Sequence, residues 1–218
     1  VGVTVMTFTV NDISPVGMLI KRAIDILGGL VGCIFMLLIM LFVGPMIKIA
    51  SPGGSVIFSQ KRVGQNGKYF KMYKFRSMYP DAEERKKELM AQNEVSDGMM
   101  FKLENDPRII KGIGHFIRKT SLDEFPQFFN VLKGDMSLVG TRPPTVDEWV
   151  KYDLHHRLRM AMRPGITGMW QVSGRSDIKE FEEVVKLDAE YIAKWNVGLD
   201  IKIMFKTIAQ VFKGDGAR

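Results

Sequence analysis

Cysteine and histidine are scarce in this chain of 218 residues. The single cysteine, Cys33, excludes a disulfide-stapled scaffold and fits a reducing, cytosolic environment for the soluble part. The 3 histidines include the adjacent pair His155 and His156, whose rings we expect to point apart on a helix. A histidine metal site therefore has little support, and His115 receives no role.

Several well-known active-site motifs are missing. The sequence contains no P-loop, no glycine-rich dinucleotide motif and no nucleophile elbow. It also lacks zinc-finger spacing and an RNA-recognition motif, so nucleic acid is not expected as a partner. The formal net charge is nonetheless +7, which favours an anionic partner such as a phosphorylated substrate or an acidic lipid surface.

Charged side chains are absent from residues 26–47. As a helix this run would measure about 33 Å, against a hydrocarbon core of roughly 30 Å. We therefore predict a membrane-inserted helix over residues 17–50. Residues 1–16 are interpreted as the tail of a preceding domain or a linker, and residues 51–218 as the catalytic domain. A buried helix of a soluble protein is the alternative.

Both flanks of the apolar run are basic, with Lys21 and Arg22 before it and Lys48 after it. The positive-inside rule normally leaves one flank poor in lysine and arginine. We therefore expect both ends on the cytosolic side and a bend within the run. The glycines and the Gly44-Pro45 pair are the candidate break points. A straight, tilted helix that crosses the membrane is the competing interpretation.

A β-hairpin is predicted after this run. Residues 55–60 read as a strand, Asn66-Gly67 is a turn signal, and residues 68–76 can return as a second strand. The return strand interleaves aromatic residues with bases, including Lys74 and Arg76. It is predicted either to bind a nucleotide and its phosphates or to lie among lipid headgroups. A helix is predicted to start at Pro80, and residues 93–107 are predicted to form a loop.

An adjacent acid pair, Asp123 and Glu124, begins a helical pattern over residues 122–132, with Gly134 as its C-cap. Pro126 fits only in the first turn of a helix, which places both carboxylates at the helix start. Two neighbouring carboxylates suit a divalent metal. The alternative is a structural one, because Ser121 and Glu124 also match a capping box.

Four arginines lie near this pair or in glycine- and proline-rich segments: Arg118, Arg142, Arg163 and Arg175. A guanidinium group suits two-point contact with phosphate, and such segments let the backbone approach a ligand. Each arginine alone is more often part of a surface ion pair.

Seven ordered blocks of the sequence resemble the bacterial polyprenyl-phosphate phosphoglycosyl transferases. They are Lys21-Arg22 with Asp25, Gly54–Phe58, Tyr73–Met78, Ser121–Glu124, Asn130–Ser137, Gly140–Pro143 and Arg163–Arg175. The narrower resemblance is to capsule-initiating undecaprenyl-phosphate glucosyl- and galactosyl-1-phosphate transferases. In that family a Ser-Pro pair breaks the membrane helix near its middle, whereas here the middle of the apolar run, Phe35–Ile39, has no such pair and its one proline, Pro45, lies near the far end.

The resemblance implies a fold of the α/β class, more narrowly α+β. A small, mostly helical catalytic domain with a short hairpin would be attached to a re-entrant membrane helix and interfacial amphipathic helices. It also implies transfer of a hexose-1-phosphate, glucose or galactose being favoured, from a UDP-sugar to undecaprenyl phosphate with release of UMP. The reaction would initiate capsular or exopolysaccharide synthesis at the cytoplasmic face of the cell membrane.

Residue roles follow from the same resemblance. Asp123 would attack the phosphate that bears the sugar, Glu124 together with Asp123 would hold Mg²⁺, and Arg118 and Arg175 would bind phosphate. The expected partners are the UDP-sugar, undecaprenyl phosphate and the bilayer, with a second copy of the chain and capsule-assembly proteins as further ones. The rival functions are a metal-dependent membrane phosphatase or phosphodiesterase, and a non-enzymatic membrane-anchored basic module.

Overall fold

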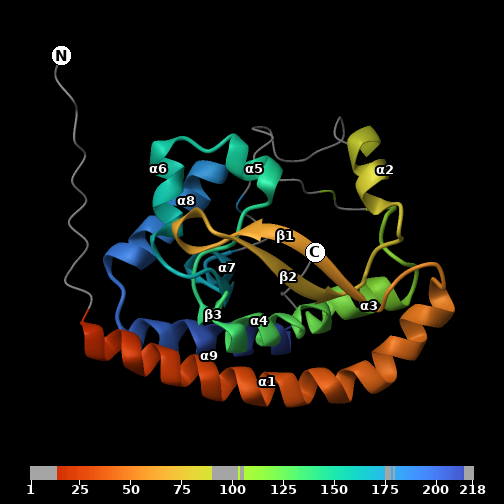
Figure 1. The fold of residues 1–218 in the computed structure, drawn as a ribbon, viewed down its shortest axis with the longest axis horizontal. Coiled ribbons are helices and arrows are strands. Elements are labelled where there is room, and N and C mark those ends of the chain that lie inside the picture. The colour runs from red at the N-terminus through yellow and green to blue at the C-terminus, as the bar shows by residue number, and fades with distance from the viewer. Residues whose placement is uncertain (1–13, 90–102, 104–105, 175–177, 179, 214–218) are drawn as a thin grey trace.

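The computed structural model describes residues 14–89, 103, 106–174, 178 and 180–213 (Figure 1). In chain order its elements are α1 (Pro15–Ala50), β1 (Ile57–Val63), η1 (Gln65–Gly67), β2 (Tyr69–Phe75), α2 (Ala82–Leu89), α3 (Ile113–Lys119), η3 (Leu122–Glu124), α4 (Gln127–Lys133), β3 (Ser137–Val139), α5 (Val146–Val150), α6 (Leu154–Arg157), η4 (Leu158–Ala161), β4 (Gly165–Thr167), α7 (Met169–Val172), α8 (Phe181–Ala193) and α9 (Val197–Lys213). The η elements are short 3-10 helices. This mostly helical mixture confirms the predicted α+β class.

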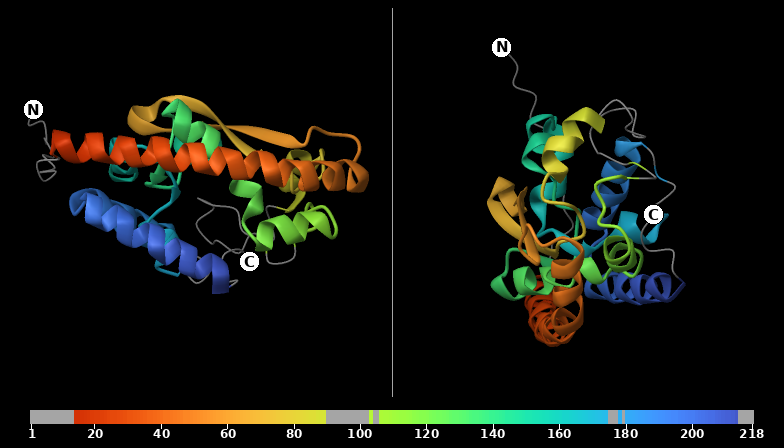
Figure 2. Two further views of the ribbon diagram at one scale, coloured as in Figure 1. Left: turned by 90° about the horizontal axis from the view of Figure 1, so that it is seen from below. Right: turned by 90° about the vertical axis from the view of Figure 1, so that its right-hand side faces the viewer.

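The apolar run forms a single continuous helix, α1, along the base of the molecule (Figures 1 and 2). It begins at Pro15, two residues before the predicted start, where the missing proline N–H costs nothing. The helix is curved, with its concave side facing the rest of the domain and its last turns rising toward it, and it continues through Pro45 (Figure 1). The helix is therefore not interrupted at Gly44-Pro45, although its axis curves in its C-terminal part, as the expected bend requires. Val43 and Ile47 are buried beside this proline, against Phe75, and their packing holds the last turns in place.

Polar contacts fasten the N-terminal part of α1. Lys21 Nζ lies 2.7 Å from Asp200 Oδ2 on α9, and Asp25 Oδ1 accepts a 2.9 Å hydrogen bond from the hydroxyl of Ser137 at the start of β3. Arg22 donates to two carbonyl oxygens at the C-terminal end of α4, each at 2.8 Å. The basic residues before the apolar run thus have structural partners, and their charge alone does not report membrane topology.

Glycines of α1 allow close packing on α4. A Cβ atom on Gly32 would lie 2.1 Å from Cγ of Phe128, and one on Gly29 would lie 2.8 Å from Cδ2 of Leu132. The glycines that looked like weak points in the helix are therefore the places where α4 approaches most closely. Because a neighbouring helix covers them, α1 passes through them unbroken.

Within the described residues, α1 is the one helix long and apolar enough to cross a membrane by length and composition. Both of its ends nevertheless pack on the same domain, through Lys21 at one end and Ile47 at the other. These two residues are about 39 Å apart along a helix, more than the thickness of a hydrocarbon core. Large apolar side chains on the side away from the domain, such as Phe35, Leu41 and Phe42, are exposed.

The C-terminal helix α9 lies beside α1 along the base (Figures 1 and 2). Ile203 of α9 is buried, whereas Ile201, Phe205 and Ile208 are exposed at helical spacing. This is the pattern expected of an interfacial amphipathic helix. Together the outer sides of α1 and α9 give the molecule an exposed apolar base.

The predicted hairpin is confirmed. β1 and β2 pair antiparallel in a register that runs from Ile57↔Phe75 to Val63↔Tyr69. The turn between them contains Asn66 and Gly67, both with positive φ, as the turn signal predicts. β1 begins two residues later than predicted and extends further.

The other elements complete the domain. β3 and β4 form a second, parallel two-stranded sheet, whose residue Val139 packs with residues of α8 and α9. The helix expected from Pro80 begins at Ala82 as α2. The loop predicted over residues 93–107 lies mostly outside the described residues.

Candidate active site

One face of the hairpin forms a wall of the site. Side chains alternate between the two faces of a strand, and the face that carries Gln60 and Arg62 on β1 also carries Met72 and Lys74 on β2. All four line a cavity of about 290 Å³. Tyr69 and Tyr73 belong to the other face and do not line it, so the predicted nucleotide stacking has no support from these two aromatic residues.

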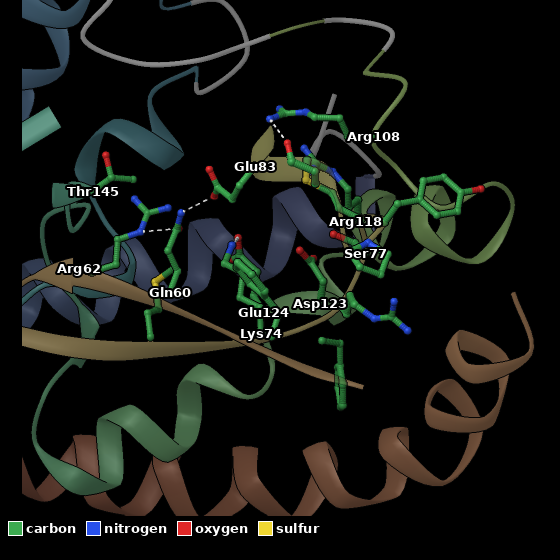
Figure 3. A pocket seen from close by; sticks show the side chains of 18 of the residues that line it. Gln60, Arg62, Lys74, Ser77, Glu83, Arg108, Arg118, Asp123, Glu124 and Thr145 are labelled. Atoms are coloured by element: carbon green, nitrogen blue, oxygen red, sulfur yellow. Dashed lines mark hydrogen bonds and ion pairs between the residues drawn. The ribbon is translucent and has the colours of Figure 1, made fainter. Parts of the chain in front are cut away.

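The acid pair projects into this cavity from η3 (Figure 3). Asp123 is buried, with 8% of its surface exposed, and Glu124 is half-buried. The helical pattern predicted over residues 122–132 is present as a 3-10 turn followed by α4, which begins at Gln127 directly after Pro126. Gly134 ends α4 in the left-handed conformation, as predicted.

The capping box that competed with a functional role for the acids does not form. Ser121 has φ 55° and makes no side-chain cap hydrogen bond with a described residue. A left-handed conformation is unfavourable for a residue with a Cβ atom, and such strain is typical of functional sites. The conformation of Ser121 turns the chain from the end of α3 into η3, which directs Asp123 into the cavity.

Lys74 is held beside the acid pair. Its Nζ atom lies 3.2 Å from Oε1 of Glu124, and both side chains are largely buried. Asn130 on α4 fixes the strand that carries Lys74, because its Oδ1 accepts from the N–H of Tyr73 at 3.0 Å and its Nδ2 donates to the carbonyl of Lys71 at 2.7 Å. One fully buried amide therefore joins β2 to the helix that follows the acid pair.

Arg118, in the last turn of α3, also lines the cavity. In Figure 3 it lies with Ser77 on one side of Asp123, and Gln60 and Arg62 lie on the other side. Its guanidinium group forms no hydrogen bond or salt bridge with any residue in the described part of the chain. Of the predicted phosphate ligands that line the cavity, Arg118 is the one that no described side chain binds.

Arg142 reaches the same cavity but is bound to Glu148, with Nη–Oε distances of 2.9 and 3.1 Å. Burial favours the neutral acid, yet the attraction of Arg142 outweighs it and holds the pKa of Glu148 at about 2. Burial, reinforced by the nearby charge of Arg142, lowers the pKa of Arg62 to about 10. Arg142 and Glu148 therefore neutralise each other in the cavity wall.

Arg76 lines the cavity too, but it is 6% exposed and mostly engaged. Its Nη1 atom donates to Oγ of Ser51 at 2.9 Å and its Nη2 atom to the carbonyl of Gly54 at 3.3 Å. Arg76 thus ties the residues after α1 to the end of β2. Burial lowers its pKa.

Two predicted ligands are not placed in the site. Arg163 is not among the described residues that line the cavity. Arg175 lies outside the described residues, so its predicted contact with phosphate stays a prediction.

Among the cavity residues that sequence reasoning missed are Gln60, Arg62 and Glu83. Gln60 and Arg62 could have been found, because the period of two along β1 places them on the same face as Phe58, opposite Lys74. Glu83 carries no such signal. It comes from α2 and reaches Gln60 only through the tertiary fold.

The prediction that the rings of His155 and His156 point apart is wrong. Their ring centroids lie 3.9 Å from each other. Both approach Glu182, at 3.1 Å from His155 and 2.7 Å from His156. The N–H of Asp153 donates to Nδ1 of His156, which leaves the proton on Nε2 facing Glu182. That nitrogen has no lone pair to offer a metal. The hydrogen bonds of His155 and His156 to Glu182 therefore support a structural role for this cluster.

The acid pair, by contrast, fits a divalent cation. Mg²⁺ is bound through one or two carboxylates together with substrate phosphates. Asp123 and Glu124 provide two adjacent carboxylates in one cavity wall, and the cavity beside them is open to a ligand. These hard oxygen donors fit Mg²⁺ better than a softer metal.

Residues 16–214 match the bacterial sugar transferase family. The chain is 52% identical over its whole length to a galactosyl transferase of Streptococcus agalactiae serotype III, of which it spans 47%. It is 45% identical to an undecaprenyl-phosphate galactose phosphotransferase of Salmonella typhimurium, with 91% of this chain and 41% of that protein aligned. It is 37% identical to an exopolysaccharide production protein of Rhizobium meliloti, with 94% of this chain and 91% of that protein aligned.

The chain thus spans about half the length or less of the first two relatives and most of the third. The matched region contains the membrane helix, the hairpin and the acid pair together. The chain belongs to the bacterial sugar transferase family.

Proposed function

We propose that this protein transfers a hexose-1-phosphate from a UDP-sugar to undecaprenyl phosphate and releases UMP. One observation carries the proposal. A buried carboxylate, Asp123, lies between Lys74 and Arg118 in a cavity of a domain whose base is apolar. Such an arrangement suits a phosphorylated substrate and a lipid acceptor together. The names of the relatives, which include a galactose phosphotransferase acting on undecaprenyl phosphate, support it.

The reaction would proceed in two displacements. The carboxylate of Asp123 attacks the phosphorus that bears the sugar, the bond to the bridging oxygen breaks, and UMP leaves with that electron pair. A phosphate oxygen of the lipid then attacks the same phosphorus, and the Asp123 carboxylate leaves. A carboxylate nucleophile divides one difficult transfer into two easier steps. In each step a phosphoryl bond forms and another breaks.

The surrounding residues stabilise charge and exclude water. Arg118 can bind the phosphate oxygens with its planar fork of donors, and Lys74 adds a positive charge next to Glu124. Mg²⁺ held by Asp123 and Glu124 would neutralise the diphosphate and the departing UMP. The burial of Asp123 protects an acyl phosphate at this position from hydrolysis.

The apolar base would lie in the cytoplasmic leaflet of the membrane. Because both ends of α1 pack on one domain, the helix can enter the lipid from one side and leave on that same side. The exposed apolar side chains of α9 would rest in the same layer. The headgroup of undecaprenyl phosphate then lies near the catalytic domain without leaving the membrane.

The test is an assay of the purified protein in lipid nanodiscs with undecaprenyl phosphate, Mg²⁺ and a panel of UDP-sugars. UMP and a lipid-linked sugar phosphate should appear in equal amounts, and Asp123→Ala should produce neither. Free sugar phosphate formed without lipid-linked product would instead indicate a hydrolase.

A further inference from the structure

Three linked side chains occupy one end of the active-site cavity. Arg62 donates through Nη1 to the carbonyl of Pro143 and through Nε to Oε1 of Gln60, each at 3.0 Å. Gln60 in turn donates through Nε2 to Oε1 of Glu83 at 3.0 Å. Figure 3 shows this series on the side of Asp123 that is opposite to Arg118.

The charges at this end of the cavity balance. Arg62 and Arg142 are opposed by Glu83 and Glu148, and Arg142 is fully engaged with Glu148. A phosphate brought here would lose its hydration and meet carboxylates as well as guanidinium groups. A neutral group with many hydroxyls would meet no such penalty. This end is therefore chemically distinct from the Arg118 end, where a guanidinium group that no described side chain binds faces the cavity.

The hydrogen-bonding capacity that remains suits hydroxyl groups. Arg62 fixes the orientation of the Gln60 amide, because the amide oxygen accepts its Nε–H and the amide nitrogen then faces Glu83. One N–H of Gln60 and Oε2 of Glu83 keep no partner among the described residues. A hydroxyl both donates and accepts, so neighbouring sugar hydroxyls can satisfy this donor and this acceptor together.

We propose that Gln60 and Glu83 are specificity-determining residues that bind hydroxyl groups of the hexose in the UDP-sugar. The proposal rests on the proposed function. In an in-line displacement the leaving UMP lies opposite the attacking carboxylate, and the hexose extends away from that axis. With the phosphates held at Arg118, the charge-balanced end at Gln60 and Glu83 receives the sugar. Epimers that move one hydroxyl would lose or misplace one of these hydrogen bonds.

The test compares kcat/KM for UDP-glucose, UDP-galactose and their N-acetylated relatives in Glu83→Ala, Gln60→Ala and the wild type. The matched control is Glu84→Ala, because Glu84 is the next residue of α2, is exposed and does not line the cavity. Loss of a hydrogen bond to a charged group should change the preference between C4 epimers by about tenfold in Glu83→Ala. Inhibition by UMP should stay as in the wild type, and Glu84→Ala should change neither quantity.

Two results would overturn the assignment. An unchanged order of sugar preference in active Glu83→Ala protein would show that this end does not contact the hexose. Weaker inhibition by UMP with the same sugar preference would show that it binds the nucleoside. Glu83 is exposed on its helix, so its variant should fold even if Gln60→Ala does not. A wild-type protein that makes no lipid-linked product from any sugar would contradict the proposed function itself.

Discussion

Lys21 and Asp200 form a buried ion pair, with Nζ 2.7 Å from Oδ2, although 179 positions separate them in the sequence. The other carboxylate oxygen of Asp200 accepts a 2.7 Å hydrogen bond from the hydroxyl of Tyr191. The pair joins α1 to α9, the two helices that carry the apolar base.

Removing the lysine should leave an uncompensated charge in the interior. Lys21→Met is expected to lower the free energy of unfolding by about 3–5 kcal/mol, the usual cost of breaking a buried pair. Thermal unfolding of the wild type and Lys21→Met in nanodiscs measures this loss of stability. Lys48→Met, at the exposed C-terminal end of α1, is the control and should change little. Equal stability of the two variants would contradict the structural role of the pair.

The left-handed conformation of Ser121 predicts which substitutions this position tolerates. Ser121→Gly should change the free energy of unfolding by less than about 1 kcal/mol, whereas Ser121→Val should lower it by about 1–2 kcal/mol, because a β-branched residue is strained at φ 55°. The valine variant should also lose turnover, since it displaces Asp123. Ser59→Val, on the exposed side of β1, is the matched control. A valine variant as stable as the glycine variant would count against this conformation.

The Arg142–Glu148 pair predicts a pH dependence of stability. The pKa of Glu148 falls from 4.5 to about 2 on folding, and its side chain is 12% exposed. The stabilisation is therefore complete above the unfolded pKa and is lost as the pH falls toward 2. It amounts to roughly 3 kcal/mol. Denaturant unfolding of wild type and Glu148→Gln should differ most at pH near 7 and least in acid. A difference that stays constant with pH would disprove the assignment.

The packing of both ends of α1 on one domain predicts that they share a compartment. In a Cys33→Ser background, single cysteines at Val16 and Gly53 should react with an impermeant maleimide only after the cells are permeabilised. A cysteine at Asp147, exposed on α5, reports the compartment of the domain itself and should behave identically. Labelling of one end from outside, with the other protected, would mean that α1 crosses the membrane.

Local sequence information was enough for much of the fold. The alternation along β1 and β2, the Asn66-Gly67 turn and the glycine cap at Gly134 all depend on neighbours in the sequence, and all three are present. The acid pair likewise lies at the start of a helical segment, because Pro126 allows no other position.

What local patterns could not show is which distant residues meet. The capping pattern at Ser121 gives way to a turn imposed by the packing of α3 against η3. Pro45 does not break α1, because tertiary contacts hold its neighbours Val43 and Ile47. Arg142, read as a phosphate ligand, is bound to Glu148, six residues along the chain, in a pairing that depends on the loop between them. The sequence shows that a charged residue is present, but it does not show which residue the fold places beside it.

The proposed mechanism makes Asp123 a covalent nucleophile. The most direct test mixes the protein with a UDP-sugar and Mg²⁺ in the absence of any lipid acceptor, followed by intact-mass and peptide mass spectrometry. We expect release of about one equivalent of UMP per protein and a phosphohexose adduct on the peptide that contains Asp123, with neither in Asp123→Asn. UMP release that requires undecaprenyl phosphate, with no adduct on Asp123, would contradict it.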